Sequence, residues 1–120
     1  MPGKQRIYII DDDKDFGLLL QSYFEKRGYH IDIFYLLQEG FDAIENDPPD
    51  MVFLDNNLPD GLGWEKITVI LEQFPGVDLH LLSGYNYTNI PFSRDAKVKV
   101  WQKPVNQFEL DKYFGDGRAS

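Results

Sequence analysis

Short apolar runs that stop abruptly at a polar residue recur along this chain, and they constrain its fold more than any other feature. Residues 7–10 (IYII) are followed at once by Asp11, and residues 51–54 (MVFL) by Asp55. Runs that are apolar throughout, without alternation, are typical of parallel strands covered on both faces. The pattern predicts five strands, centred on residues 7–10, 31–34, 51–54, 77–82 and 98–101.

Amphipathic segments separate these runs and predict helices. In the first of them Leu19, Leu20 and Tyr23 fall on one helical stripe, and Gly28 follows where a helix would end. Helices that alternate with strands form right-handed crossovers between parallel strands, which indicates a doubly wound α/β domain. The predicted helices cover residues 15–26, 36–44, 64–74 and 105–114.

The stretch from Tyr85 to Lys97 interrupts this alternation. It should contain the fourth helix, but Pro91 lies in its middle and no apolar stripe runs through it. We therefore expect a short, irregular or missing helix between the fourth and fifth strands.

Length and composition indicate one small acidic domain. The 120 residues suit a single domain, with a core from about residue 6 to 114 and flexible ends at 1–5 and 115–120. The absence of cysteine excludes a disulfide scaffold, thiolate zinc sites and thiol catalysis. With 20 acidic against 12 basic residues, non-specific nucleic-acid binding is not expected. No apolar run could span a membrane or form a signal peptide, so we expect a cytoplasmic protein.

The polar residues at the strand ends predict where the chemistry lies. Ligands of an open parallel sheet bind at the carboxyl ends of its strands, and these ends carry residues 11–13 (DDD), Asp55, Ser83 and Lys103. Clustered carboxylates need a counter-charge, and Mg²⁺ prefers such oxygen ligands. Lys103 adds a second positive charge and Ser83 a hydroxyl. This set suits phosphoryl transfer, with Asp55 as the nucleophile.

Each of these residues also has an ordinary structural explanation. Asp13 can cap the first helix, Asp55 can be a turn residue, and Ser83 with Gly84 can form a simple turn. We favour the functional interpretation because these features are independent of one another, yet all fall on strand carboxyl ends.

Four segments, IYIIDDD, MVFLDNNLPDGLGWE, LHLLSG and WQKPV, together resemble the response-regulator receiver domain, the phospho-acceptor module of bacterial two-component signalling. The resemblance extends from Ile7 to about Phe114. It implies a flavodoxin-like (βα)5 three-layer sandwich whose parallel sheet has the strand order 2-1-3-4-5.

The resemblance also implies a role for individual residues. Asp55 matches the phospho-accepting aspartate, which also contacts the metal. Asp11 and Asp12 match the acid pair that holds Mg²⁺ or Mn²⁺, with Asp12 favoured as the direct ligand, and Asn57 matches the position whose backbone carbonyl completes the metal site. The remaining matches are the switch hydroxyl Ser83, the phosphoryl-binding Lys103, and Pro104, which often follows a cis peptide bond.

By this resemblance the chain accepts a phosphoryl group onto Asp55 from the phosphohistidine of a sensor kinase or a phosphotransfer domain. Phosphorylation would then switch the conformation and signal to a partner or to a fused output domain. We expect no enzymatic turnover beyond assistance to its own phosphorylation and slow dephosphorylation. We also expect a monomer or a weak phosphorylation-dependent dimer.

The sequence differs from the family pattern in the region through which receivers usually signal to their partners. Val100 stands where receivers usually have Tyr or Phe, and strand alternation places Trp101 on the opposite face. The irregular segment after Ser83 adds to this departure, and we expect its Tyr85 to shield the acyl phosphate partly from water.

Two other functions are compatible with parts of the sequence. A phosphorylation-independent receiver, acting only as an interaction module, would explain Val100 and the irregular segment. A phosphatase similar to the haloacid dehalogenases would use Asp11 and Asp13, which have that family's spacing. The second alternative leaves Asp55 without a role, and the chain is short for that family.

Overall fold

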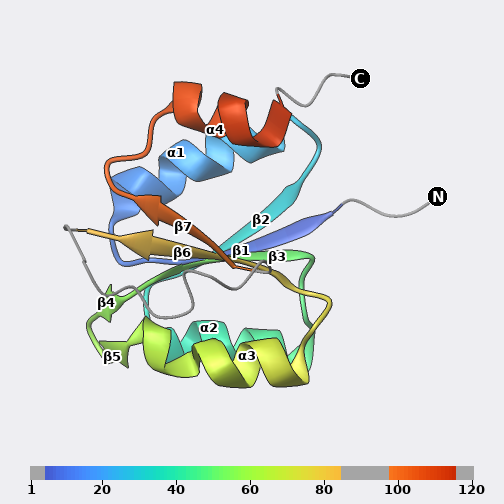
Figure 1. The fold of residues 1–120 in the computed structure, drawn as a ribbon, viewed down its shortest axis with the longest axis vertical. Coiled ribbons are helices and arrows are strands. Elements are labelled where there is room, and N and C mark those ends of the chain that lie inside the picture. The colour runs from blue at the N-terminus through green and yellow to red at the C-terminus, as the bar shows by residue number, and fades with distance from the viewer. Residues whose placement is uncertain (1–4, 85–97, 116–120) are drawn as a thin grey trace.

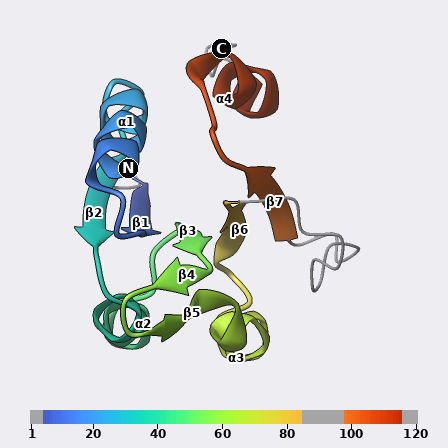
Figure 2. The same ribbon diagram turned by 90° about the vertical axis from the view of Figure 1, so that its left-hand side faces the viewer.

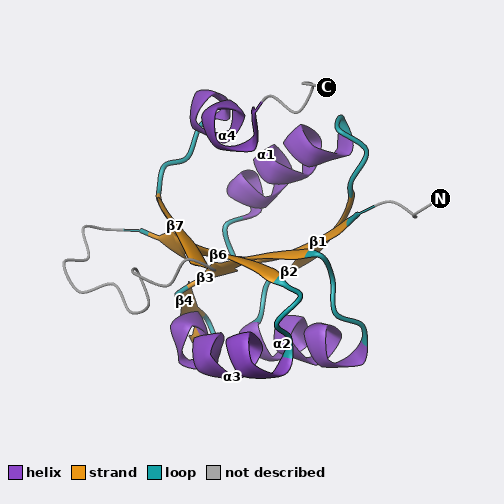
Figure 3. Cartoon of the chain, turned by 45° about the vertical axis from the view of Figure 1, so that its right-hand side comes forward, coloured by secondary structure: helices purple, strands orange, loops and turns teal. Residues whose placement is uncertain are grey.

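A five-stranded parallel sheet with helices on both faces forms the domain. The computed structural model describes residues 5–84 and 98–115. In Figures 1 and 3 the sheet is the middle layer, α1 and α4 cover one face, and α2 and α3 cover the other. This arrangement confirms the predicted three-layer α/β sandwich.

The sheet has the strand order β2-β1-β3-β6-β7, and every pair is parallel. Counting only the strands of this sheet, the order is the predicted 2-1-3-4-5. The strands are β1 (Arg6–Ile10), β2 (His30–Phe34), β3 (Met51–Asp55), β6 (Asp78–Ser83) and β7 (Val98–Gln102). The helices are α1 (Lys14–Glu25), α2 (Leu37–Asn46), α3 (Ile67–Gln73) and α4 (Gln107–Phe114).

The segment between β3 and α3 differs from the prediction of one helix over residues 64–74. A two-stranded antiparallel hairpin comes first, made of β4 (Asn57–Leu58) and β5 (Gly61–Leu62). One 3-10 turn follows over Gly63–Lys66, and only then does α3 begin. The backbone N–H groups of Gly63 and Trp64, at the start of this turn, donate to the carbonyl and side-chain oxygens of Asn56.

Side-chain caps fix the starts of two helices. Asp13 accepts a hydrogen bond from the backbone N–H of Phe16 (3.1 Å) at the start of α1. Asn106 and Glu109 form the predicted capping box at the start of α4. The Lys103–Pro104 peptide bond just before α4 is cis, as the resemblance implied. The segment 85–97, with Tyr85, for which a short, irregular or missing helix is predicted, lies outside the described residues.

The sheet separates two apolar cores, and strand alternation distributes β7 between them. Val100 packs against the cluster formed with α2 and α3, whereas Trp101 belongs to the cluster formed with α1 and α4. The predicted placement of these two residues on opposite faces is therefore confirmed.

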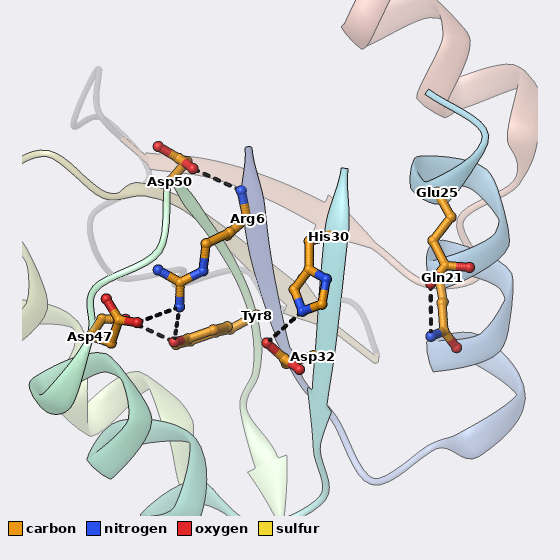
Figure 4. A network of polar contacts seen from close by, with 8 residues as sticks. All are labelled: Arg6, Tyr8, Gln21, Glu25, His30, Asp32, Asp47 and Asp50. Atoms are coloured by element: carbon orange, nitrogen blue, oxygen red, sulfur yellow. Dashed lines mark hydrogen bonds and ion pairs between the residues drawn. The ribbon is translucent and has the colours of Figure 1, made fainter. Parts of the chain in front are cut away.

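A polar network ties the amino-terminal end of β1 to the segment between α2 and β3 (Figure 4). The guanidinium group of Arg6 donates to the hydroxyl of Tyr8 (2.7 Å) and pairs with Asp47 (3.0 Å). The Tyr8 hydroxyl donates to the Asp47 carbonyl, and the Arg6 backbone N–H donates to the Asp50 carboxylate, both at 2.7 Å. Asp47 and Asp50 therefore find their partners in β1, at the end of the strand opposite Asp11.

Candidate functional site

The strand register brings the predicted site residues to one edge of the sheet. Ile10 pairs with Leu54 across β1 and β3, so Asp11 and Asp55 follow at the same level. On the other side of β3, Asp55 pairs with Leu82 of β6. The same edge carries Ser83, whose carbonyl accepts a 2.7 Å hydrogen bond from the backbone N–H of Lys103.

Three carboxylates form the centre of this site. One oxygen from each of Asp11, Asp12 and Asp55 lies within 4.8 Å of the others. Asp11 is fully buried, Asp55 is 6% exposed, and Asp12 faces the solvent. A compact set of hard oxygen atoms with one solvent-facing member fits Mg²⁺ or Mn²⁺, which keep bound waters beside a few carboxylates. This cluster could therefore hold a divalent metal.

Lys103 supplies the positive charge that the buried acids require. Its Nζ atom lies 2.7 Å from Oδ2 of Asp11 and 3.8 Å from Oδ1 of Asp55. The same ammonium group lies 5.0 Å from the ring centre of Phe16, within cation–π range. Lys103 is thus held between both carboxylates at the site.

Burial dominates the titration of these acids. The pKa of Asp55 is raised to about 6, chiefly by burial and also by the negative charge of Asp11, while Lys103 opposes both effects. Burial likewise raises the pKa of Asp11, against the hydrogen bond from Lys103. In the absence of a metal, ionisation of Asp55 therefore destabilises the folded protein.

The segment after Asp55 is folded tightly against the acceptor strand. The Asn56 carbonyl accepts from the Gly63 N–H (2.8 Å), and its side-chain oxygen accepts from the Trp64 N–H (3.1 Å). A Cβ atom at position 63 would lie 2.1 Å from the Asp55 carbonyl oxygen, so only glycine fits there. Asn57 begins the hairpin at an exposed position.

Not every sequence-predicted residue belongs to the acid cluster. Asp13 caps α1 and does not join the three carboxylates. Ser83 is buried at the end of β6, and the roles of its hydroxyl and of the Asn57 carbonyl stay predictions. Sequence reasoning missed Asn56, although the Asn pair after Asp55 was a signal that the turn carries side-chain hydrogen bonds.

A family model for the response regulator receiver domain matches residues 7–113. The chain belongs to the response-regulator receiver family. A chain of known structure, a CheY-like receiver domain protein from Methanospirillum hungatei, is 29% identical and superposes with a TM-score of 0.83. The match covers 95% of this chain and 93% of that one.

Two curated relatives differ in how much of their length this receiver spans. It is 39% identical to the transcriptional regulatory protein YxdJ of Bacillus subtilis, covering 78% of this chain and 48% of that protein. The response regulator receiver protein CpdR of Brucella abortus is 25% identical, with 88% and 90% covered. The receiver therefore spans about half of YxdJ and nearly all of CpdR. It spans 43% of a further relative, the photosynthetic apparatus regulatory protein RegA of Rhodobacter capsulatus. No helix among the described residues is long and apolar enough to cross a membrane.

Proposed function

We propose that this receiver accepts a phosphoryl group on Asp55 from a phosphohistidine of a sensor kinase or phosphotransfer domain. The observation that carries the proposal is the convergence of Lys103 with the carboxylates of Asp11 and Asp55 at one strand edge. Membership of the receiver family supports the same chemistry.

In the proposed step a carboxylate oxygen of Asp55 attacks phosphorus in line with the bond to the donor imidazole. The new O–P bond forms an acyl phosphate, the P–N bond breaks, and its electron pair returns to the imidazole nitrogen. Asp55 must be ionised to attack. Because burial favours its protonated form, positive charges at the site promote the reaction.

Lys103 and Ser83 would stabilise the transferred group. The ammonium group of Lys103 already lies 3.8 Å from Asp55 Oδ1, close enough to pair with a phosphoryl oxygen attached there. Ser83 ends the neighbouring strand, and its hydroxyl can donate to another phosphoryl oxygen. Reorientation of Ser83 would bias the receiver toward a signalling conformation.

The acid cluster would hold Mg²⁺ or Mn²⁺ through Asp11, Asp12, Asp55 and the backbone carbonyl of Asn57, with Asp12 exposed for direct ligation. A bound cation supplies charge neutralisation for the phosphoryl oxygens. The chain's own contribution is to fix the carboxylates around one point before the donor arrives.

The proposal includes the setting of the reaction. The receiver would assist its own phosphorylation and slow hydrolysis without acting as a turnover enzyme. It would work in the cytoplasm and signal to a partner protein or a fused output domain, as the regulators that it half covers suggest.

Intact-mass measurement after incubation with acetyl phosphate and Mg²⁺ tests the proposal. The parent should gain one phosphoryl group, and Asp55→Asn should gain none. Asp42→Asn, an exposed acid on α2, is the matched control and should behave like the parent. The absence of an adduct on the parent would favour a phosphorylation-independent interaction module, and sustained phosphate release would favour a phosphatase.

A further inference from the structure

The first turn of α2 is capped by a residue from a different part of the chain. Leu36 occupies the N-cap position, but its side chain makes no capping hydrogen bond. The carboxylate of Asp60 instead accepts hydrogen bonds from the backbone N–H groups of Leu37 (2.7 Å) and Gln38 (2.9 Å). One oxygen serves each donor, so two of the groups that a helix leaves unsatisfied at its start find a partner.

The charge of Asp60 strengthens this cap. The hydrogen bonds from Gln38 and Leu37 lower the pKa of Asp60, so the carboxylate stays ionised to a lower pH than an ordinary aspartate does. An ionised acceptor forms stronger hydrogen bonds than a neutral one and interacts favourably with the positive end of the helix dipole.

Asp60 lies at the tip of the hairpin whose first residue is Asn57. In this hairpin Asn57 pairs with Leu62 and Leu58 with Gly61, which leaves only residues 59 and 60 in the turn. Figures 1 and 2 show the hairpin beside α2, next to the end of β3. Asp60, in the turn, is therefore only three residues along the chain from Asn57 at the base.

The same helix also packs behind the acid pair. A Cβ atom at Gly40 of α2 would lie 2.5 Å from Cδ1 of Ile10, which shows how closely the helix approaches β1. Ile10 directly precedes Asp11. Helix α2 therefore touches the strand that carries one part of the site and, through Asp60, the hairpin that carries another.

Apolar packing alone would hold the hairpin less specifically. Leu58 and Leu37 belong to the same buried cluster, so they contribute attraction between the hairpin and α2. That attraction has no directional preference, whereas two hydrogen bonds from successive N–H groups fix the carboxylate at one place on the helix.

We propose that Asp60 is a positioning residue for the metal site, because it ties the hairpin that begins at Asn57 to the helix that packs behind Asp11. The inference rests on the proposed function, in which Asn57 contributes its carbonyl to the metal. Cation binding and order in the first turn of α2 are then coupled, and the coupling acts in both directions.

Calorimetric titration with Mg²⁺ alone measures the first consequence. Asp60→Ala should raise the dissociation constant about three- to tenfold, less than the roughly 10–100-fold typical when a partner bonded directly to a ligand is lost. Glu39→Ala removes a charge from the same first turn but keeps the hydrogen bonds to Asp60. It should change the dissociation constant for Mg²⁺ by less than about twofold. Asp60→Asn keeps one acceptor oxygen, and its dissociation constant for Mg²⁺ should lie between those of the parent and Asp60→Ala.

A rescue variant separates positioning from simple helix stability. Adding Leu36→Ser to Asp60→Ala gives α2 a local N-cap, because Leu36 has the extended backbone that an N-cap requires. The double variant should regain thermal stability but keep its weakened affinity for Mg²⁺. Full recovery of affinity would overturn the positioning role.

Hydrogen exchange followed by NMR provides a readout that is independent of affinity. Saturating Mg²⁺ should slow exchange of the Leu37 and Gln38 amides in the parent, and should not do so in Asp60→Ala. If Asp60→Ala binds Mg²⁺ as tightly as the parent does, this inference is overturned and the proposed function remains intact. Failure of the parent to bind Mg²⁺ would overturn both.

Discussion

The indole N–H of Trp101 donates a 2.9 Å hydrogen bond to Nδ1 of His80, and both side chains are buried. The other ring nitrogen of His80, Nε2, lies 3.1 Å from a carboxylate oxygen of Asp78. The pair joins β6 and β7 shortly before these strands end at Ser83 and lead into Lys103. It thus holds in register two strands that deliver residues to the site.

Replacement of Trp101 by phenylalanine should destabilise the protein by about 1–3 kcal/mol, because Nδ1 of the buried His80 would lose its donor. His80→Phe retains the stack on Phe53, whose ring centre lies 4.8 Å away. The double variant should be less destabilised than the sum of the single variants, with a coupling of about 1 kcal/mol. Urea denaturation of the four proteins measures this cycle, and strictly additive effects would show that the hydrogen bond is unimportant.

Asp55→Asn should stabilise the metal-free protein at neutral pH. The pKa of Asp55 is raised to about 6 in the folded state, chiefly by burial, so protonated Asp55 favours folding. That contribution is complete below about pH 4, the range of an unperturbed aspartate, and is lost as the pH rises through about 6. At pH 7 the deficit of the parent relative to the variant should approach about 3 kcal/mol at most.

Urea denaturation of both proteins in EDTA from pH 4 to 8 measures this difference. The gap between Asp55→Asn and the parent should widen with pH and narrow when Mg²⁺ replaces EDTA. A gap that stays constant across the range would contradict the assigned effect of burial on Asp55.

Lys103→Met should destabilise the metal-free protein by about 2–4 kcal/mol, because the fully buried Asp11 would lose its 2.7 Å counter-charge. Adding Asp11→Asn removes the stranded charge and should restore most of the loss. Thermal unfolding in EDTA compares the three proteins. Equal melting temperatures for the parent and Lys103→Met would mean that the ion pair contributes nothing to stability.

Gly63→Ala should destabilise the protein by more than about 3 kcal/mol, since the added carbon would overlap the Asp55 carbonyl oxygen and must displace the acceptor strand or the hairpin. Gly76→Ala is the matched control, because a Cβ atom there meets nothing within 4 Å. Chemical denaturation measures both. Similar stabilities for the two variants would show that the segment after Asp55 yields easily.

The sequence predicted the sheet and the acid cluster because both depend on signals that lie within short stretches. Apolar runs ending at Asp11 and Asp55 define strands and their carboxyl ends together, and parallel register then brings the aspartates to one edge. Neighbouring residues also carry the capping box of α4, since Asn106 and Glu109 are three positions apart.

Features that depend on contacts between distant residues could not be predicted from the sequence. The β4–β5 hairpin has strands of two residues, too short for any periodicity to appear. Asp60 caps a helix that begins 23 positions earlier, and nothing local marks that pairing. The sequence placed His80 in a buried strand but did not indicate its partners, which are Trp101 and the aromatic side chains of α4.

The contact between Lys103 and Asp11 would also limit how strongly a cation binds to the cluster. The site already contains a counter-ion that belongs to the chain, so an incoming divalent ion competes with an ammonium group. Competition of this kind weakens binding, because part of the electrostatic attraction is satisfied beforehand. Occupancy would then follow the free concentration of the cation instead of remaining saturated, and the receiver would exchange its metal readily.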